Sequence, residues 1–273
     1  MKIYDCFMYF DEDLLLNLRL NILYDYIDQF IILEAEEDHQ GNKRKLNFDI
    51  KKFKKFSKKI KYIPLKKINI DPSIKIKKNW DAGHLRDQSM RNSFKEYLND
   101  AEPDDWIIIS DLDEIPNPIK FNDFKSRDKY AFFKQNFYYY KFNIINKSQP
   151  YWFGSRICVK KHLKSPQWLR NIKIKKYSFF KKFFLNKNYK VIEDGGWHFS
   201  FIKSPERIIK KINSFCHGEF NKNEFKDIEK IEKKISELKD IFDRPIEYAK
   251  VEVDNSYPKY FLHNIEKYKS WLV

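Results

Sequence analysis

Apolar residues follow two different periods in the first 109 residues of the chain. From Asp13 to about Tyr24 they recur every three or four positions, which predicts an amphipathic helix. Elsewhere they form short runs rich in β-branched residues, which are typical of buried strands. The strands that we expect are Lys2–Phe10, Gln29–Glu34, Lys61–Leu65 and Trp106–Ile109. The further helices that we expect are Asp49–Lys58 and Trp80–Tyr97, the second with Asn79 as its cap.

The second half of the chain is richer in aromatic residues. Residues 129–143 and 151–160 are β-prone runs that we expect as antiparallel strands. Residues 172–185 fit either a strand or a loop, and residues 189–200 predict a strand, a glycine break and a short return strand. Apolar positions from Phe225 to Phe242 predict an amphipathic helix of about five turns.

This order of elements predicts an α/β fold. Strands that alternate with helices favour a mixed, mainly parallel sheet with helices on both faces. The later aromatic runs would add antiparallel strands, and the end of the chain would form a helical tail.

A cluster of carboxylates follows the strand Trp106–Ile109. In an extended chain Asp111 and Asp113 point the same way, and Glu114 lies just beyond them. Like charges so close together repel, so we expect a cation between them. Mg2+ or Mn2+ fits, because these hard ions bind carboxylate oxygens and share them with substrate phosphates. The alternative is a solvated turn after a core strand.

Composition narrows the class of protein. The 273 residues carry a formal net charge of +15, and 34% of them are charged. Such a surface attracts nucleic acid, anionic lipid or phosphorylated substrates, although the simpler explanation, lysines spread over a solvated surface, is favoured. A mean hydropathy of −0.71 and the absence of any long apolar run argue against a transmembrane helix.

The cysteines and the N-terminus suggest a location. Cys6, Cys158 and Cys216 are far apart and form no zinc motif or disulfide framework, which favours a reducing compartment. The first residues lack a signal-peptide core. We therefore expect a cytoplasmic protein, and its charge permits peripheral contact with a membrane.

Several motifs together resemble glycosyltransferase family 17, which includes the β-1,4-mannosyl-glycoprotein 4-β-N-acetylglucosaminyltransferase. The resemblance runs from Met1 to about Asn221. The stretches that carry it are Tyr4–Glu12, Arg19–Tyr24, Phe30–Ala35, Ser110–Pro116 and Gly196–Ser200. It implies a GT-A-type, Rossmann-like fold, a UDP-sugar donor, most simply UDP-GlcNAc, and a glycan, glycolipid or glycoprotein acceptor, with no nucleic acid partner.

The resemblance assigns roles to the carboxylate cluster. Asp113 is our first choice as direct metal ligand, and Asp111 would hold a metal-bound water or the ribose hydroxyls. His198 is a second metal candidate, because Gly195 and Gly196 before it indicate a close backbone approach. A lone histidine between aromatic residues is more often a satisfied core residue.

Donor contacts are expected from strand ends and from one helix. Phe7, Tyr9 and Glu34 stand at the ends of the first two strands, where nucleotides bind in such sheets. Core packing explains the two aromatic residues equally. Arg86 or Arg91 would clamp the diphosphate, although Arg91 is also spaced for an ion pair with Asp87 one turn away.

An inverting transfer needs a carboxylate base that deprotonates the acceptor hydroxyl. Asp194 is our first candidate and Glu219 the second. Glu114 would orient a neighbour or bind the acceptor. We also expect Tyr138, Trp152 and Trp197 at the acceptor, although aromatic residues that alternate along a strand, such as Tyr138 and Trp152, are more often part of the core.

The expected domains are a catalytic domain over residues 1–220 and a helical extension over residues 221–273 that packs on it. Within the first, residues 1–116 would bind the nucleotide sugar and residues 117–220 the acceptor. Two other functions stay open. The four apolar residues followed by Asp111, Leu112 and Asp113 resemble the nucleophile loop of haloacid-dehalogenase-type phosphatases. The interleaved lysines and aromatic residues fit a nucleic-acid-binding protein.

Overall fold

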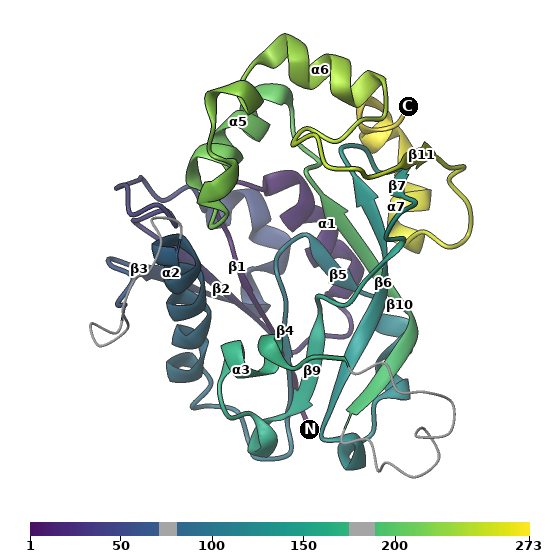
Figure 1. Cartoon of the computed structure of the whole chain (residues 1–273). Coiled ribbons are helices and arrows are strands. Elements are labelled where there is room, and N and C mark those ends of the chain that lie inside the picture. The colour runs from purple at the N-terminus through teal and green to yellow at the C-terminus, as the bar shows by residue number, and fades with distance from the viewer. Residues whose placement is uncertain (71–80, 175–188) are drawn as a thin grey trace, which may run out of the picture.

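The computed structural model describes residues 1–70, 81–174 and 189–273 of the chain. An eleven-stranded mixed sheet forms its centre, and eight of its strands follow the order β11-β7-β6-β9-β4-β1-β2-β3 (Figure 1). The strands are β1 (Ile3–Met8), β2 (Gln29–Ala35), β3 (Ile60–Leu65), β4 (Trp106–Ile109), β5 (Glu114–Pro116), β6 (Tyr130–Tyr139), β7 (Ile144–Asn146), β8 (Tyr151–Trp152), β9 (Arg156–Val159), β10 (Tyr189–Ser200) and β11 (Tyr248–Lys250).

Helices and 3-10 segments link these strands. The α-helices are α1 (Asp13–Leu23), α2 (Asp81–Asn92), α3 (Pro166–Asn171), α5 (Pro205–Ser214), α6 (Ile228–Ser236) and α7 (Lys259–His263). The 3-10 segments are η1 (Ile50–Lys59), η2 (Ser93–Tyr97), η3 (Pro118–Asp123), η4 (Ser126–Asp128), η5 (Lys160–His162), η6 (Gly218–Phe220), η7 (Asn223–Phe225) and η8 (Ile265–Trp271).

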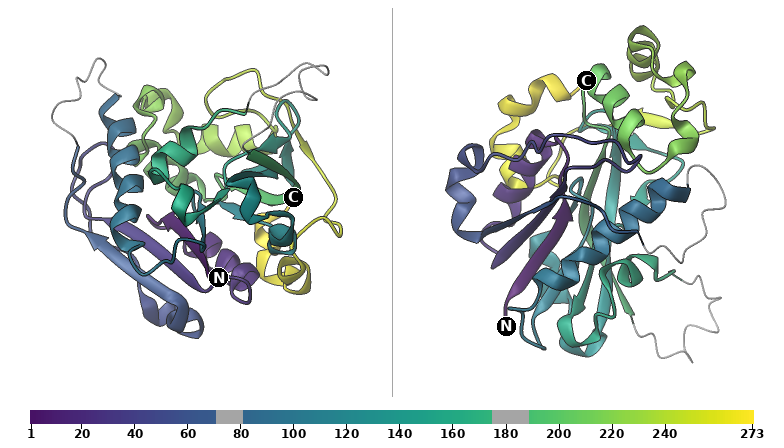
Figure 2. Two further views of the ribbon diagram at one scale, coloured as in Figure 1. Left: turned by 90° about the horizontal axis from the view of Figure 1, so that it is seen from below. Right: turned by 90° about the vertical axis from the view of Figure 1, so that its left-hand side faces the viewer.

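Four parallel strands, in the order β3-β2-β1-β4, carry the first half of the chain. Side chains on them alternate between two cores. On one face Phe30 and Ile108 pack with α1, η1 and α7, and on the other face Ile31 and Ile107 pack with α2, η2 and α3. Helices thus cover both faces of this part of the sheet (Figure 2). The chain adds β2 and β3 on one side of β1 and then β4 on the other. The carboxyl ends of β1 and β4 therefore flank the point where ligands bind in open α/β sheets.

Antiparallel strands extend the sheet beyond β4. β9 pairs with β4 and with β6, and β6 lies parallel to the long strand β10. A third apolar core, around Tyr139, Ile208 and Ile231, joins β6 to α5 and α6. The predicted fold class is thus confirmed: a mixed α/β sheet flanked by helices, with added antiparallel strands.

Some predicted elements differ from the structure. Residues 189–200 form one strand, because the glycine break is an irregularity in the pairing of β10 with β6 between Ile192 and Gly196 and no return strand follows. The long helix expected from Phe225 to Phe242 is shortened to α6, and Leu238 beyond it has a left-handed φ of 54°. The predicted helical tail also contributes β11, which pairs with β7.

Two predicted helices also differ in detail. The basic helix expected at 49–58 is the 3-10 segment η1, kinked at Phe53. The helix expected at 80–97 is α2 followed by η2. The predicted cap Asn79 and the start at Trp80 lie outside the described residues, as does most of the segment 172–185. Among the helices of the described residues, none combines the length and the apolar composition that a membrane-spanning segment needs.

Candidate active site

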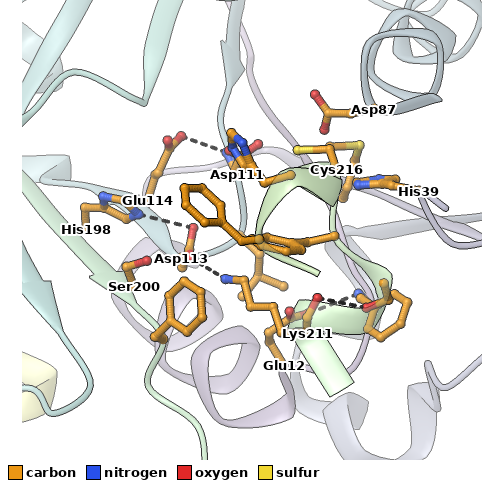
Figure 3. Close-up of a pocket in the computed structure, with 18 of the residues that line it drawn as sticks. Glu12, His39, Asp87, Asp111, Asp113, Glu114, His198, Ser200, Lys211 and Cys216 are labelled. Atoms are coloured by element: carbon orange, nitrogen blue, oxygen red, sulfur yellow. Dashed lines mark hydrogen bonds and ion pairs between the residues drawn. The ribbon is translucent and has the colours of Figure 1, made fainter. Parts of the chain in front are cut away.

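A cavity of about 420 Å3 lies at the carboxyl ends of β1, β2 and β4. The turn after β4, with Asp111 to Glu114, forms its floor, and His198 and Ser200 face it from β10 (Figure 3). Lys211 of α5 and the loop after that helix line another side, and Phe242 and Arg244 of the C-terminal segment also contribute. Polar groups thus converge in one concave site, which is the usual arrangement of a binding pocket.

The turn itself is held from below by Arg19. This arginine of α1 is fully buried, and its guanidinium pairs with buried Asp5 of β1 at 2.5 Å and 2.8 Å. It also donates to the hydroxyl of Ser110 at 2.6 Å. Its third nitrogen, Nη1, donates to the backbone carbonyls of Asp111, Leu112 and Glu114 at 3.2, 3.2 and 2.8 Å. A single side chain therefore fixes the backbone of the carboxylate cluster.

This turn corrects one expectation about Asp111 and Asp113. They do not continue the strand, because the chain turns after Ile109. In this turn the amide of Glu114 donates to the carbonyl of Asp111 at 3.0 Å, and the chain then continues as β5. β5 then pairs with β10, which sets Glu114 opposite His198. Residues from two distant parts of the chain meet here as a result.

Asp111 lies between two arginines. Arg91 of α2 and Arg170 of α3 each donate to its carboxylate at 3.0 Å. Burial disfavours the charged form of Asp111, but these two guanidinium groups lower its pKa to about 2. Its carboxylate is thus ionised and held at the edge of the cavity.

That lowered pKa predicts a loss of stability in acid. An ionised group whose pKa is depressed by folding contributes stability above its unfolded pKa of about 3.9, and this contribution is lost as the pH falls through the folded value. The urea midpoint of the wild type should therefore drop between about pH 4 and pH 2 more steeply than that of Asp111→Asn, measured by circular dichroism. Parallel curves for the two proteins would contradict this contribution from Asp111.

Asp113 faces His198 and Lys211. Its Oδ1 lies 3.7 Å from Nε2 of His198, and its Oδ2 lies 3.5 Å from Nζ of Lys211. Burial opposes ionisation, but Lys211 and His198 hold the pKa of Asp113 well below its usual range. The ring of His198 stacks on Phe137, with centroids 4.5 Å apart, so the aromatic wall fixes its orientation. An anionic carboxylate and a nitrogen ligand therefore face the same space.

Glu114 is buried and has three partners. Arg170 donates to both of its carboxylate oxygens at 2.6 and 3.0 Å, and the indole of Trp152 donates at 2.7 Å. Its Oε2 also accepts from the backbone amide of Asp111 at 2.8 Å. A carboxylate so fully engaged organises its neighbours, above all Trp152 and Arg170.

Gly154 leaves room for this arrangement, which yields a prediction. A Cβ at this position would lie 1.9 Å from Oε1 of Glu114, so a methyl group must displace that carboxylate or the backbone. Gly154→Ala should lower the free energy of unfolding by about 1–3 kcal/mol, the usual cost of overpacking. Urea denaturation measures this loss, and a variant as stable as the wild type would show that Glu114 moves at no cost.

The other predicted donor residues have varied positions. Tyr9 lines the cavity and donates to Asp13 at 2.6 Å, whereas Phe7 is buried beneath Arg19. Glu34 is fully buried and accepts from Arg44, from Tyr62 and from two backbone amides, so it fixes the loop after β2. Arg86 donates to the carbonyl of His39 and does not line the cavity.

Several residues predicted for the base and the acceptor lie elsewhere. Asp194 and Trp197 line a second cavity of about 460 Å3, and Tyr138 packs on Phe199 and Tyr257. Alternation along β10 explains the position of Trp197, which points away from the face that carries His198. Asp194 lies in the irregular stretch of β10 between Ile192 and Gly196, where its φ is 47°. Glu219 lies beside the first cavity, where its Oε1 is 2.9 Å from Nδ1 of His217. Trp152 does line that cavity.

Sequence reasoning missed three cations of this site: Arg19, Arg170 and Lys211. A charge in the leucine-rich α1 was a usable signal for Arg19, since a fully buried arginine requires partners. Arg170 belongs to α3, whose start was readable from Ser165, which caps the helix, and Pro166 at its first position. Lys211 is one of many lysines, and no sequence signal distinguishes it.

The residues present fit a divalent cation. The 3.7 Å between Oδ1 of Asp113 and Nε2 of His198 lets both bind one ion after a small adjustment. Nε2 is the ring nitrogen of His198 that faces Asp113, whereas Nδ1 is buried and has no hydrogen-bond partner among the described residues. The remaining positions around such an ion would be left for water and substrate phosphates.

Comparison with known protein families gives a match over nearly the whole chain. The family model of glycosyltransferase family 17 matches residues 1–272. The match thus includes the segment after Asn221, beyond the reach of the sequence motifs described above. No curated protein matches the chain.

Proposed function

The chain belongs to glycosyltransferase family 17, and from this we propose that it transfers N-acetylglucosamine from UDP-GlcNAc to a hydroxyl of a glycan, glycolipid or glycoprotein acceptor. The proposed reaction depends on Mn2+ or Mg2+ and inverts the anomeric carbon. Family membership implies a glycosyl transfer from a nucleotide sugar, and it favours this activity over the phosphatase and nucleic-acid-binding alternatives.

One observation carries the metal-dependent part of the proposal. Asp113 and His198 face each other at 3.7 Å in a cavity at the carboxyl end of β4, with Lys211 beside them. In our proposal Asp113 and His198 hold the cation, which when bound offsets the negative charge that develops on the departing UDP. Lys211 is close enough to contact the diphosphate directly, and Asp111 lies beside it for a ribose hydroxyl or a water molecule.

The nucleoside half of the donor fits the ends of β1 and β2. Tyr9, Phe10 and Ala35 line this part of the cavity, and the guanidinium of Arg44 packs over the ring of Phe10 at 4.0 Å. Apolar and aromatic walls with a few polar groups are typical of sites that bind a base. The diphosphate would then extend from this end toward Lys211.

The acceptor would enter along the opposite wall, which is aromatic. Trp152, Tyr139 and Phe201 line the cavity there, and Glu114 fixes the indole of Trp152. In the proposed step the acceptor oxygen forms a bond to the anomeric carbon while the bond to the β-phosphate oxygen breaks. UDP departs and a base takes the proton of the hydroxyl. Proton NMR of the first product formed distinguishes inversion from retention.

A thermal-shift screen of UDP, GDP, CMP and dTDP sugars, each with Mn2+ or with EDTA, tests the donor and the metal. Binding at 100 times the dissociation constant stabilises the native state by about 2.7 kcal/mol. We expect the largest shift with UDP-GlcNAc and Mn2+, and we expect EDTA to abolish it. A shift that survives EDTA would contradict the metal dependence but not the proposed donor. Lys211 would then be the main charge partner of the diphosphate. No shift with any nucleotide sugar would contradict the proposed donor site.

A further inference from the structure

Three separate segments of the chain meet beside the cavity: the loop after β2, the start of α2 and the loop after α5. The backbone amide of His39 donates to the carbonyl of Ser214 at 3.1 Å, and the side chain of Gln40 donates to the carbonyl of Phe215 at 2.7 Å. Gly83 of α2 lies against the third segment, since a Cβ there would be 2.7 Å from the carbonyl of Cys216. The junction is therefore closely packed.

This junction gathers metal-binding side chains. Cys216, His84 and His217 each offer a ligand atom, and these atoms all lie within 4.8 Å of one another. Cys216 also forms such a group with His39 and Asp87, whose ligand atoms likewise lie within 4.8 Å of one another (Figure 3). His84 and Asp87 are three positions apart on α2 and so lie on the same face of the helix. One thiol is thus surrounded by three imidazoles and one carboxylate.

We propose that this junction is a second cation site, built for a borderline-soft ion such as Zn2+, with Cys216, His84 and His217 as ligands. Asp87 and His39 are grouped with Cys216 but not with the other two ligands, so either of them would complete the four only after a side-chain movement. Cysteine and histidine together favour zinc, whereas the carboxylate cluster at Asp113 favours a harder ion. Zinc prefers four ligands in tetrahedral geometry, and the two overlapping groups supply five candidates.

A neighbouring carboxylate supports this assignment. Oε1 of Glu219 lies 2.9 Å from Nδ1 of His217, which leaves Nε2 of that ring for the ion. Histidine ligands of metals commonly donate their other ring N–H to a carboxylate, which fixes the tautomer and the ring orientation. Glu219 would thus orient a metal ligand, in place of the role as catalytic base that the sequence suggested.

The ion would connect this junction to the donor site. Asp87 accepts from Arg91 at 2.7 and 2.9 Å, and Arg91 in turn donates to Asp111 at 3.0 Å. Zinc at the junction would hold α2 against the loop after α5, which carries part of the cavity wall. The inference stands on these contacts and does not depend on the proposed transfer of GlcNAc.

Co2+ titration of the metal-free protein tests the site, because a thiolate ligand gives Co2+ a near-ultraviolet charge-transfer band. We expect one Co2+ per chain with this band, displaced by one Zn2+. Cys216→Ser should lose the band, and Glu219→Gln should weaken binding about 10–100-fold.

Two variants serve as controls. Asp113→Asn should keep the band, and so should His162→Ala, which alters a histidine of η5 outside the cluster. A band unchanged in Cys216→Ser, or folded wild type that binds Co2+ without such a band, would overturn the proposal.

A second measurement needs no variant. Cys6 and Cys158 are fully buried, whereas Cys216 is partly exposed, so iodoacetamide should modify Cys216 first in the native protein. Zn2+ bound to the thiolate should slow that modification at least tenfold, as followed by mass spectrometry of peptides. Equal rates with and without Zn2+ would overturn the assignment of Cys216 as a ligand, whatever the donor screen shows.

Discussion

Replacing Asp113 with asparagine is expected to keep the fold and to lower turnover of UDP-GlcNAc at least 100-fold. The amide has the size of the carboxylate but no negative charge, so it would bind a cation opposite His198 much more weakly. Lys211 would also lose its ion-pair partner at 3.5 Å. Removing a group that stabilises developing charge typically costs about 3 kcal/mol or more, which corresponds to that loss in rate.

Steady-state release of UDP, measured with varied Mn2+, checks this prediction. Asp104→Asn is a matched control, because Asp104 is exposed and pairs only with Lys161 at 2.6 Å in the described structure. It should leave kcat and the Mn2+ dependence unchanged. Near-normal kcat in Asp113→Asn would refute the role of Asp113 at the cation, and an equal loss in both variants would point to a general effect of charge.

Replacing Arg19 with methionine is expected to lower the free energy of unfolding by about 3–5 kcal/mol, the usual cost of breaking a buried ion pair. The change leaves the carboxylate of Asp5 buried without its partner, and it removes the donor to three carbonyls of the turn after β4. Since whole domains are stable by only about 5–15 kcal/mol, this is a large fraction of the total.

Urea denaturation at pH 7 measures the effect. Arg207→Met should change stability by no more than about 0.5 kcal/mol, because Arg207 is exposed and makes one 3.3 Å hydrogen bond to the carbonyl of Asp11. The double variant Asp5→Asn/Arg19→Met should recover part of the loss, since the unpaired charge is then removed. An Arg19→Met protein within 1 kcal/mol of the wild type, with an unchanged urea slope, would contradict this account.

The parallel part of the fold could be predicted from local patterns. The strands β1, β2, β3 and β4 read as short apolar runs, and α1 has a clear helical period, so their order alone indicated an α/β sheet. The predicted ends of helices were wrong where tertiary contacts override local propensity. The apolar period from Phe225 to Phe242 continues past Ser236, but the chain leaves the helix, and Leu238 takes a left-handed φ. The pattern alone does not reveal this departure.

The candidate site was predictable only in part. Local signals identified three of its residues. Carboxylates that follow an apolar strand indicated Asp111 and Asp113, and glycines before a histidine indicated His198. Arg170 acts through contacts between residues far apart in the chain, to Asp111 and to Glu114. Asp194 and Trp197 line the second cavity. Local sequence does not specify this position, because it depends on the pairing of β10 with β5 and on its irregular pairing with β6.

The contribution of Phe242 and Arg244 to the cavity wall has a consequence for the newly made protein. Ribosomes add about 5–20 residues each second, so these two residues follow Asp113 by roughly ten seconds. A nascent chain that already carries the whole carboxylate turn therefore still lacks one side of its pocket. Polypeptides that stall before residue 242 would lack this side of the pocket. The apolar core around Tyr139 would also lack Phe242 and Tyr248, and its exposed part would be a target for chaperones.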